Sequence, residues 1–143
     1  GGIHFNGEDL AVESNQVSLH ETKKDKFDLP IPTLNLDDHP NDLSMRSYAN
    51  QRSVDGLQSA GAIRVFKSPP TPASHNLGTC RMSDSAENGV VNKWGQSHEI
   101  PNLFVSDGSQ FVSSTAANPT CLIVALAIRQ SRYITQQMAS GNL

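Results

Sequence analysis

The sequence has little cysteine: Cys80 and Cys121 are the only two in 143 residues. A pair this sparse cannot form a disulfide framework, and neither cysteine belongs to a Cys-x-x-Cys or Cys/His pattern of the kind that binds metals. We therefore predict no metal site. Because free cysteine is among the most frequently buried residue types, we expect both thiols to be buried and unpaired.

Positive charge and long hydrophobic runs are also scarce. The formal net charge of −3 leaves no basic surface of the kind that nucleic-acid-binding proteins carry, so nucleic acid is not an expected partner. The longest strongly apolar run, residues 121–128, is far too short to cross a bilayer. The chain begins without an initiator methionine or a signal-peptide pattern. We expect the natural N-terminus to lie elsewhere, which leaves the cellular compartment open.

Hydrophobic residues make up 36% of the chain, and ten glycines and eight prolines favour a loop-rich globular fold with a modest core. Apolar and polar residues alternate over residues 16–20 and 33–36, as they do in half-buried strands. A helix is predicted from about residue 41 to residue 59, with an acidic residue in its first turn and Gly61 as its stop. Residues 62–66 alternate again and predict a further strand.

Residues 121–138 form the strongest helix pattern of the second half. Asn118 is a favourable N-cap, and Pro119 is favoured at the first helical position. The first half of this helix is apolar on all sides, which predicts that it is buried. Shorter apolar pieces predict a strand edge at residues 90–91 and a short strand at residues 103–106. Together these elements predict an α+β fold.

Three short segments of the second half are informative as a set. They read Ser-His-Asn-Leu-Gly-Thr-Cys-Arg-Met at residues 74–82, Asn-Leu-Phe-Val-Ser-Asp-Gly-Ser at residues 102–109, and Asn-Pro at residues 118–119. Their order and spacing closely resemble the C-terminal signature of the glucose–methanol–choline (GMC) oxidoreductase family. Within that family, the residues of these segments are most similar to those of the bacterial sugar and gluconate dehydrogenase-type members. The resemblance is dense over residues 74–134 and looser over residues 15–70.

This resemblance implies a two-domain flavoenzyme that oxidises a CH–OH group of a sugar, sugar acid or alcohol and passes hydride to FAD. It implies that His75 is the general base at the reacting face of the flavin, paired with Asn118, which lies 43 positions later. In the same way, Asp107 and Gly108 are implied to approach the ribityl–pyrophosphate part of FAD. Asn118 and Pro119 are implied to contact the cofactor from the amino end of the final helix.

Elementary chemistry agrees with the two catalytic assignments. Hydride leaves an alcohol carbon more easily once the hydroxyl proton has been removed, and histidine, which titrates near neutral pH, suits that task. An asparagine amide can donate a hydrogen bond to the developing alkoxide. The amino end of a helix carries partial positive charge, which would stabilise negative charge on a reduced flavin. Taken one at a time, however, a loop histidine, an Asn-Pro helix start and an Asp-Gly turn are ordinary structural features.

The family's dinucleotide-binding fingerprint, a Gly-x-Gly-x-x-Gly turn near the N-terminus, does not occur in this sequence. We therefore predict a C-terminal fragment of a larger protein, in which FAD is held mostly by an N-terminal region outside this chain. A proline-rich connector at residues 68–72 marks the main boundary. Residues 1–70 are predicted to supply strands and a helix to an antiparallel substrate-domain sheet. Residues 74–143 are predicted to carry the catalytic histidine and to return to the FAD domain with the long helix.

Two alternatives stay open from the sequence. The same family includes hydroxynitrile lyases, which hold FAD without using it for redox chemistry, and a non-catalytic accessory piece that binds a partner subunit is the other alternative. The expected partners are a small alcohol or sugar substrate, the missing FAD-binding region and an electron-acceptor subunit. The sequence does not specify the substrate or whether oxygen, a quinone or a cytochrome reoxidises the flavin. Arg81 and Trp94 are predicted to have structural roles, and His98 to lie on the surface.

Overall fold

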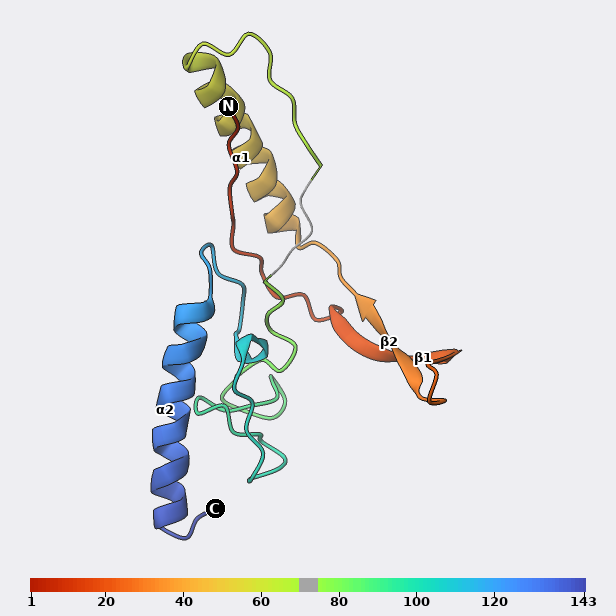
Figure 1. The fold of residues 1–143 in the computed structure, drawn as a ribbon, viewed down its shortest axis with the longest axis vertical. Coiled ribbons are helices and arrows are strands. Elements are labelled where there is room, and N and C mark those ends of the chain that lie inside the picture. The colour runs from red at the N-terminus through yellow and green to blue at the C-terminus, as the bar shows by residue number, and fades with distance from the viewer. Residues whose placement is uncertain (70–74) are drawn as a thin grey trace.

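The computed structural model describes residues 1–69 and 75–143. The elements are, in chain order, strands β1 (Gln16–Lys24) and β2 (Pro30–Asn35), helix α1 (Pro40–Ser59), the short 3-10 helix η1 (Gly108–Gln110) and helix α2 (Thr120–Ala139). Figure 1 shows α1 and α2 at opposite ends of the molecule, with the β1–β2 hairpin projecting from its middle. The predicted α+β class is confirmed in this form, as one two-stranded antiparallel sheet and two long helices. The predicted boundary at residues 68–72 falls mainly on residues 70–74, which lie outside the described residues.

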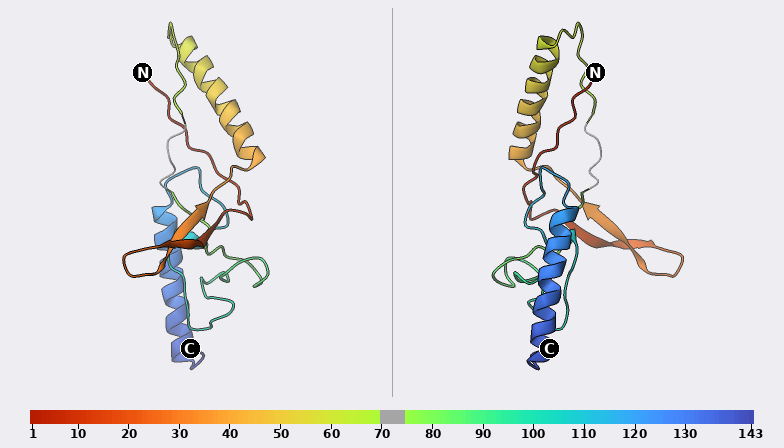
Figure 2. Two further views of the ribbon diagram at one scale, coloured as in Figure 1. Left: turned by 90° about the vertical axis from the view of Figure 1, so that its right-hand side faces the viewer. Right: turned by 60° about the vertical axis from the view of Figure 1, so that its left-hand side comes forward.

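The hairpin forms where the alternating pattern predicts strands, and both strands are longer than predicted. Its turn is held by the Asp25 carboxylate, which accepts hydrogen bonds from the N–H groups of Phe27 at 2.8 Å and Leu29 at 3.1 Å. Val17 pairs with Leu34 across the two strands, yet both side chains are more than half exposed. The right-hand view of Figure 2 shows the same hairpin extending away from the rest of the chain. Neither face of this sheet is covered.

Helix α1 begins and ends close to the predicted positions. Its N-cap is His39, whose Nδ1 accepts from the N–H of Asn41 at 3.1 Å, and Pro40 occupies the first helical position. The helix stops before Gly61, which adopts a φ of 92°, a conformation that glycine reaches without a steric penalty. The stop predicted at Gly61 is confirmed, and His39 and Pro40 define the start of the helix locally.

The strand predicted at residues 62–66 is wrong. These residues have no regular structure, and Ile63 is 99% exposed. A strand needs a neighbour to take up its N–H and C=O groups, and β1 and β2 are the only strands among the described residues. Alternation of apolar and polar residues is therefore not enough to form a strand at residues 62–66.

Helix α2 has the predicted extent, but the burial predicted for its first half is wrong. Leu122, Val124 and Ile128 are each about half exposed, because the chain packs against one side of the helix only. Cys121 is exposed and Cys80 half-buried, and both are unpaired, so the prediction of two buried thiols is also wrong. No helix of the described residues is long and apolar enough to cross a membrane.

Residues 75–118 pack beside α2 as a set of loops joined by single bridges. Val91 bridges both Met82 and Ser97, and Gln96 bridges Phe104. The predicted strands at these places are therefore reduced to isolated pairs. Val91 is completely buried, and Phe111 is the other buried apolar side chain of the described residues.

An aromatic stack joins these loops to α2. The rings of Trp94 and Tyr133 are parallel within 3°, with their centroids 4.8 Å apart, and Phe104 meets Tyr133 edge-on at 6.3 Å. Such pairs stabilise a contact beyond the area that they bury. Trp94 thus has a packing role, as predicted.

Candidate functional site

Backbone hydrogen bonds join the segment that follows His75 to η1. The N–H groups of Gly78, Cys80 and Met82 donate to the carbonyls of Gly108 at 3.3 Å, Ser109 at 2.8 Å and Gln110 at 2.9 Å, in that order. The two segments lie about 30 positions apart in the sequence and form no regular strand. Three consecutive bonds nevertheless fix their relative position.

Gly108 lies where this pair of segments meets the first turns of α2. A Cβ at position 108 would stand 2.5 Å from Cδ2 of Leu77 and 3.3 Å from Cδ1 of Ile123, so the absence of a side chain allows the three segments to approach. Leu77 follows His75 by two residues, and Ile123 follows Pro119 by four. Two of the segments that carry the family resemblance, and the first turns of the helix that follows the third, therefore meet around one glycine. The space that a side chain at position 108 would need is taken by Leu77 and Ile123. The approach of Gly108 to FAD that the resemblance implies stays a prediction.

His75 is the first described residue after the gap, and its side chain is half-buried. Its ring makes no hydrogen bond within residues 1–69 and 75–143. Asn118 likewise makes no side-chain hydrogen bond in this part of the chain and is exposed. No direct hydrogen bond between His75 and Asn118 exists here.

The prediction that Asn118 caps α2 is wrong. The N-cap is Pro119, which has a helical φ of −84° and is buried, and no side chain accepts from the first turn. The prediction of Pro119 as the first helical residue is therefore wrong by one position, because the helix begins at Thr120. The first N–H groups of a helix have no partner within it. The amino end of α2 thus remains free to donate hydrogen bonds to an acceptor outside these residues.

Asp107 has a defined hydrogen-bonding role. Its carboxylate accepts from the N–H of Ser109 at 2.8 Å and from the hydroxyl of the same residue at 2.5 Å, which makes it the N-cap of η1. The Ser109 side-chain and backbone hydrogen bonds lower the pKa of Asp107 below its usual value, against a smaller opposing effect of burial. The carboxylate is therefore ionised at neutral pH and has further lone pairs for a donor.

Two buried amides support this region, one from α2 to the loops and one within η1, and sequence reasoning missed both. Gln130 is 5% exposed and donates to the carbonyls of Trp94 at 3.1 Å and Val105 at 2.8 Å. Gln110 is 2% exposed and donates to the carbonyl of Asp107 at 3.2 Å. A signal for Gln130 was available, because it lies on the helix face that includes Pro119, Ile123, Leu126 and Tyr133, at spacings of three and four.

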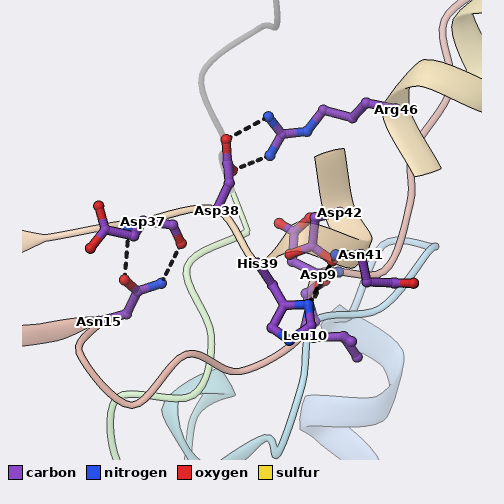
Figure 3. A network of polar contacts seen from close by, with 10 residues as sticks. Asp9, Leu10, Asn15, Asp37, Asp38, His39, Asn41, Asp42 and Arg46 are labelled. Atoms are coloured by element: carbon purple, nitrogen blue, oxygen red, sulfur yellow. Dashed lines mark hydrogen bonds and ion pairs between the residues drawn. The ribbon is translucent and has the colours of Figure 1, made fainter. Parts of the chain in front are cut away.

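A second polar network, at the amino end of α1, was also missed (Figure 3). Asp42 is 2% exposed, and its Oδ1 accepts from the N–H of Leu10 at 3.3 Å. Arg46 donates from both terminal nitrogens to Asp38. The Arg46 hydrogen bond lowers the pKa of Asp38. Burial, followed by repulsion from Asp42, raises the pKa of Asp9.

The remaining predicted roles are structural. Arg81 donates to the carbonyl of Asn88 at 2.7 Å and so closes its own loop. His98 is half-buried and shares a hydrogen bond with Ser83 at 3.2 Å, so its predicted surface position is wrong. A shallow hollow of about 280 Å³ lies beside the Trp94–Tyr133 stack and is lined by none of the predicted site residues. Within the described part of the chain, no three His, Cys, Asp or Glu residues are grouped as metal ligands.

Comparison with known proteins relates this arrangement to one family. The chain matches the GMC oxidoreductase family over residues 11–127. It is 40% identical over 136 residues to the 2-methyl-1,2-propanediol dehydrogenase of Mycolicibacterium austroafricanum, an alignment that covers 93% of this chain and 25% of that protein.

Two further relatives act on sugars or sugar acids according to their names. The chain is 27% identical over 140 residues to the fructose dehydrogenase large subunit of Gluconobacter japonicus, covering 97% of this chain and 26% of that protein. It is 23% identical over 141 residues to the gluconate 2-dehydrogenase flavoprotein of Pantoea cypripedii, covering 92% and 23%. The chain thus spans about a quarter of the length of these relatives. The resemblance of the three segments is confirmed, and the match also includes most of the first half: the chain belongs to the GMC oxidoreductase family.

Proposed function

We propose that this chain is the C-terminal catalytic portion of an FAD-dependent oxidoreductase that takes hydride from a CH–OH group of an alcohol, sugar or sugar acid. The observation that carries the proposal is the convergence of the His75 segment, η1 and the amino end of α2 around Gly108 in a chain of the GMC family. These are the segments on which the family's chemistry depends by resemblance.

His75 is the proposed general base. It would accept the hydroxyl proton of the substrate, which makes the adjoining carbon a better hydride donor. The half-buried position suits a side chain that must reach a small substrate, and the ring makes no hydrogen bond within the described residues. Asn118 is the proposed partner, since its exposed amide has a donor available for the alkoxide oxygen. Bound FAD would supply the hydride acceptor.

The residues at the cofactor side fit an anionic, hydroxyl-bearing group. The uncapped N–H groups at the start of α2, after Asn118 and Pro119, suit negative charge. Asp107, ionised and exposed, suits a hydroxyl donor. Gly108 would contribute through its backbone, because its side-chain space is occupied by Leu77. These few groups cannot hold FAD by themselves, and we propose that most contacts come from the part of the protein outside this chain.

The exposed surface supports a larger parent protein. The chain has 10,691 Å² of accessible surface, whereas a compact monomer of 15.5 kDa has roughly 7,200 Å². We propose that residues 1–70 add the β1–β2 hairpin and α1 to an antiparallel substrate-domain sheet. Residues 74–143 would return to the FAD domain, which would cover the exposed apolar face of α2.

The relatives guide the choice of substrates and partner. Their names specify a diol, a sugar and a sugar acid as substrates, so these three classes are the first to test. One relative is described as a large subunit, which supports an electron-acceptor subunit as a partner of the parent protein.

The test uses the full-length protein that contains this chain. Its absorbance spectrum is recorded anaerobically before and after addition of diols, sugars and sugar acids, and we expect bleaching of the flavin by at least one class. A bound flavin that no compound bleaches would favour a lyase, and absence of flavin would favour an accessory role; either result contradicts the proposal.

The His75→Ala variant tests the base. We expect flavin reduction to slow by about 10²- to 10⁴-fold, the range for loss of a general base, while FAD content is unchanged. His4→Ala is the matched control, because His4 is exposed and bonds only to Asn6; it should reduce flavin at the wild-type rate. A near-normal rate for His75→Ala removes His75 from this role.

A further inference from the structure

Residues 8–10 connect two parts of the chain that are far apart in the sequence. The N–H of Asp9 donates to Oγ of Ser114 at 2.6 Å, and the N–H of Ser114 donates back to the carbonyl of Asp9 at 3.2 Å. Beside them, the hydroxyl of Ser113 donates to the carboxylate of Glu8 at 2.6 Å. The N-terminal segment is therefore bound by three hydrogen bonds to the loop that leads into α2.

The other side of this segment is held by α1. Asp42, in the first turn of α1, accepts from the N–H of Leu10 at 3.3 Å, and Figure 3 shows the carboxylate beside residues 9 and 10. Asp42 is the most buried carboxylate of the described residues. A carboxylate out of contact with water is stable only when its oxygens accept hydrogen bonds or meet positive charge. Arg46, four residues further along α1, is engaged by Asp38, and the backbone N–H of Leu10 donates to the Asp42 carboxylate.

These contacts form a continuous path from α1 to Asn118. Asp42 holds Leu10, the adjoining Asp9 holds Ser114 at both its backbone and its side chain, and Asn118 follows Ser114 by four residues. Within that interval the Thr115 hydroxyl donates to the carbonyl of residue 117, which limits the freedom of the loop. We propose that Asp42 is a positioning residue, which acts through residues 9 and 10 and Ser114 to fix the loop that presents Asn118. This inference rests on the proposed function of Asn118.

Asp42 contributes a hydrogen-bond acceptor to this path. Substitutions that keep an acceptor at position 42 should therefore be tolerated, and those that remove it should not. Asn at position 42 keeps an oxygen that can accept from Leu10, whereas Ala removes it. A displacement of about 1 Å at a reacting group can slow an enzyme by about 10²-fold. We therefore expect Asp42→Ala to slow flavin reduction by about 10- to 100-fold and Asp42→Asn to stay within about threefold of the wild type.

The experiment measures anaerobic flavin reduction in the full-length protein by stopped flow, with the substrate found above. The expected effect of Asp42→Ala lies in the limiting rate, with little change in the apparent substrate affinity or in FAD content. Asp55→Ala is the matched control: Asp55 lies on α1, its side chain is 43% exposed, and its carboxylate bonds only to Gln51 and Arg52 of the same helix among the described residues. Equal rates for wild type and Asp42→Ala, or equal losses in the Ala and Asn variants, overturn the proposal.

A second variant, Ser114→Ala, tests the same path without changing Asp42. Hydrogen exchange tests the path without measuring catalytic activity. Ser114→Ala removes only the hydroxyl acceptor for Asp9 and should slow reduction less than Asp42→Ala does. In both variants, amide exchange over residues 112–119 should be faster than in the wild type, whatever the catalytic rate. Unchanged exchange in Asp42→Ala contradicts the path itself. A wild-type flavin that no substrate reduces contradicts the proposed function, whereas normal reduction in Asp42→Ala contradicts this inference alone.

Discussion

Residues 75–111 and the β1–β2 hairpin bury their residues in opposite ways. The loop region has almost no regular structure, yet it encloses Val91 completely and pairs its backbone through short, specific hydrogen bonds. The hairpin is a regular two-stranded sheet, yet Leu34 remains 75% exposed on it. Regular backbone pairing and burial are therefore separate properties of this chain. The region that carries the proposed catalytic base is the one that finds packing partners, including α2, among the described residues.

The largest expected effect on stability comes from a substitution of Gly95, which lies in the packed loop region. This glycine has a φ of 71°, and a Cβ there would stand 2.7 Å from the carbonyl oxygen of Val105 and 2.3 Å from Nε2 of Gln130. Gly95→Ala should lower the free energy of unfolding of this region by about 3 kcal/mol, through backbone strain and overpacking together. Gly61→Ala is the control, since position 61 also has a positive φ but has open space around it; it should cost about 1 kcal/mol.

Hydrogen exchange of residues 89–112 in the full-length protein measures this difference. Exchange should accelerate in Gly95→Ala and remain at the wild-type rate in Gly61→Ala, whose position is distant in sequence and structure. Similar exchange in the two variants would mean that residues 94–105 adapt more freely than their close contacts indicate.

The second prediction tests whether the hairpin is bare in the parent protein. If the proposed sheet covers it, Leu34→Ala in the full-length protein should lower the free energy of unfolding by about 2 kcal/mol, as loss of a large buried apolar side chain does. Lys23→Ala, on the neighbouring strand, is the control and should change it by less than about 0.5 kcal/mol. Thermal unfolding compares the two. Equally small changes in the free energy of unfolding for the two variants would show that the hairpin stays exposed in the full-length protein.

The smallest expected effect concerns the ion pair of Asp38 with Arg46. The pair keeps the pKa of Asp38 below its ordinary value of 3.8, so its contribution to stability is present above that pH and is lost as the pH falls through the lowered pKa. Because both side chains are partly exposed, Asp38→Asn should cost less than about 1 kcal/mol at pH 7. The difference from the wild type should vanish in strong acid, and Asp84→Asn, an exposed single-charge loss, is the control in the same pH series. A difference that persists at pH 2 contradicts this origin.

The sequence predicts local signals well and burial poorly. His39, Pro40 and Gly61 act within a few residues of themselves, so the bounds of α1 could be read from them. The apolar start of α2 predicts a buried helix, but burial depends on what surrounds the helix, and the described residues leave about half of Leu122, Val124 and Ile128 exposed. Alternation at residues 62–66 fails for the same reason, because a strand is defined by its partner.

For the candidate site too, local sequence signals were readable and long-range contacts were not. The three motif segments were identified from their order, and their family is confirmed, while the roles of His75, Asn118, Asp107, Gly108 and Pro119 stay predictions. The burial of Asp42 could not be derived from local pattern, since the backbone group that it accepts from lies 32 positions away in the sequence. For Gln130 the spacing along α2 offered a signal, but the backbone carbonyls that it bonds could not be foreseen. The cap assigned to Asn118 was wrong because residue preference does not fix the rotation of the preceding loop.

The polar loop at residues 84–89 has its two ends tied together. The N–H of Ser83 donates to the carbonyl of Val91, and the N–H of Val90 donates to that of Arg81, both at 2.8 Å. Because these two backbone bonds join the flanking residues directly, the loop can change in length at its tip while residues 81–83 stay paired with residues 90–91. It offers a permissive insertion point at which the parent protein can acquire a tether or a reporter while the segment after His75 keeps its register with η1.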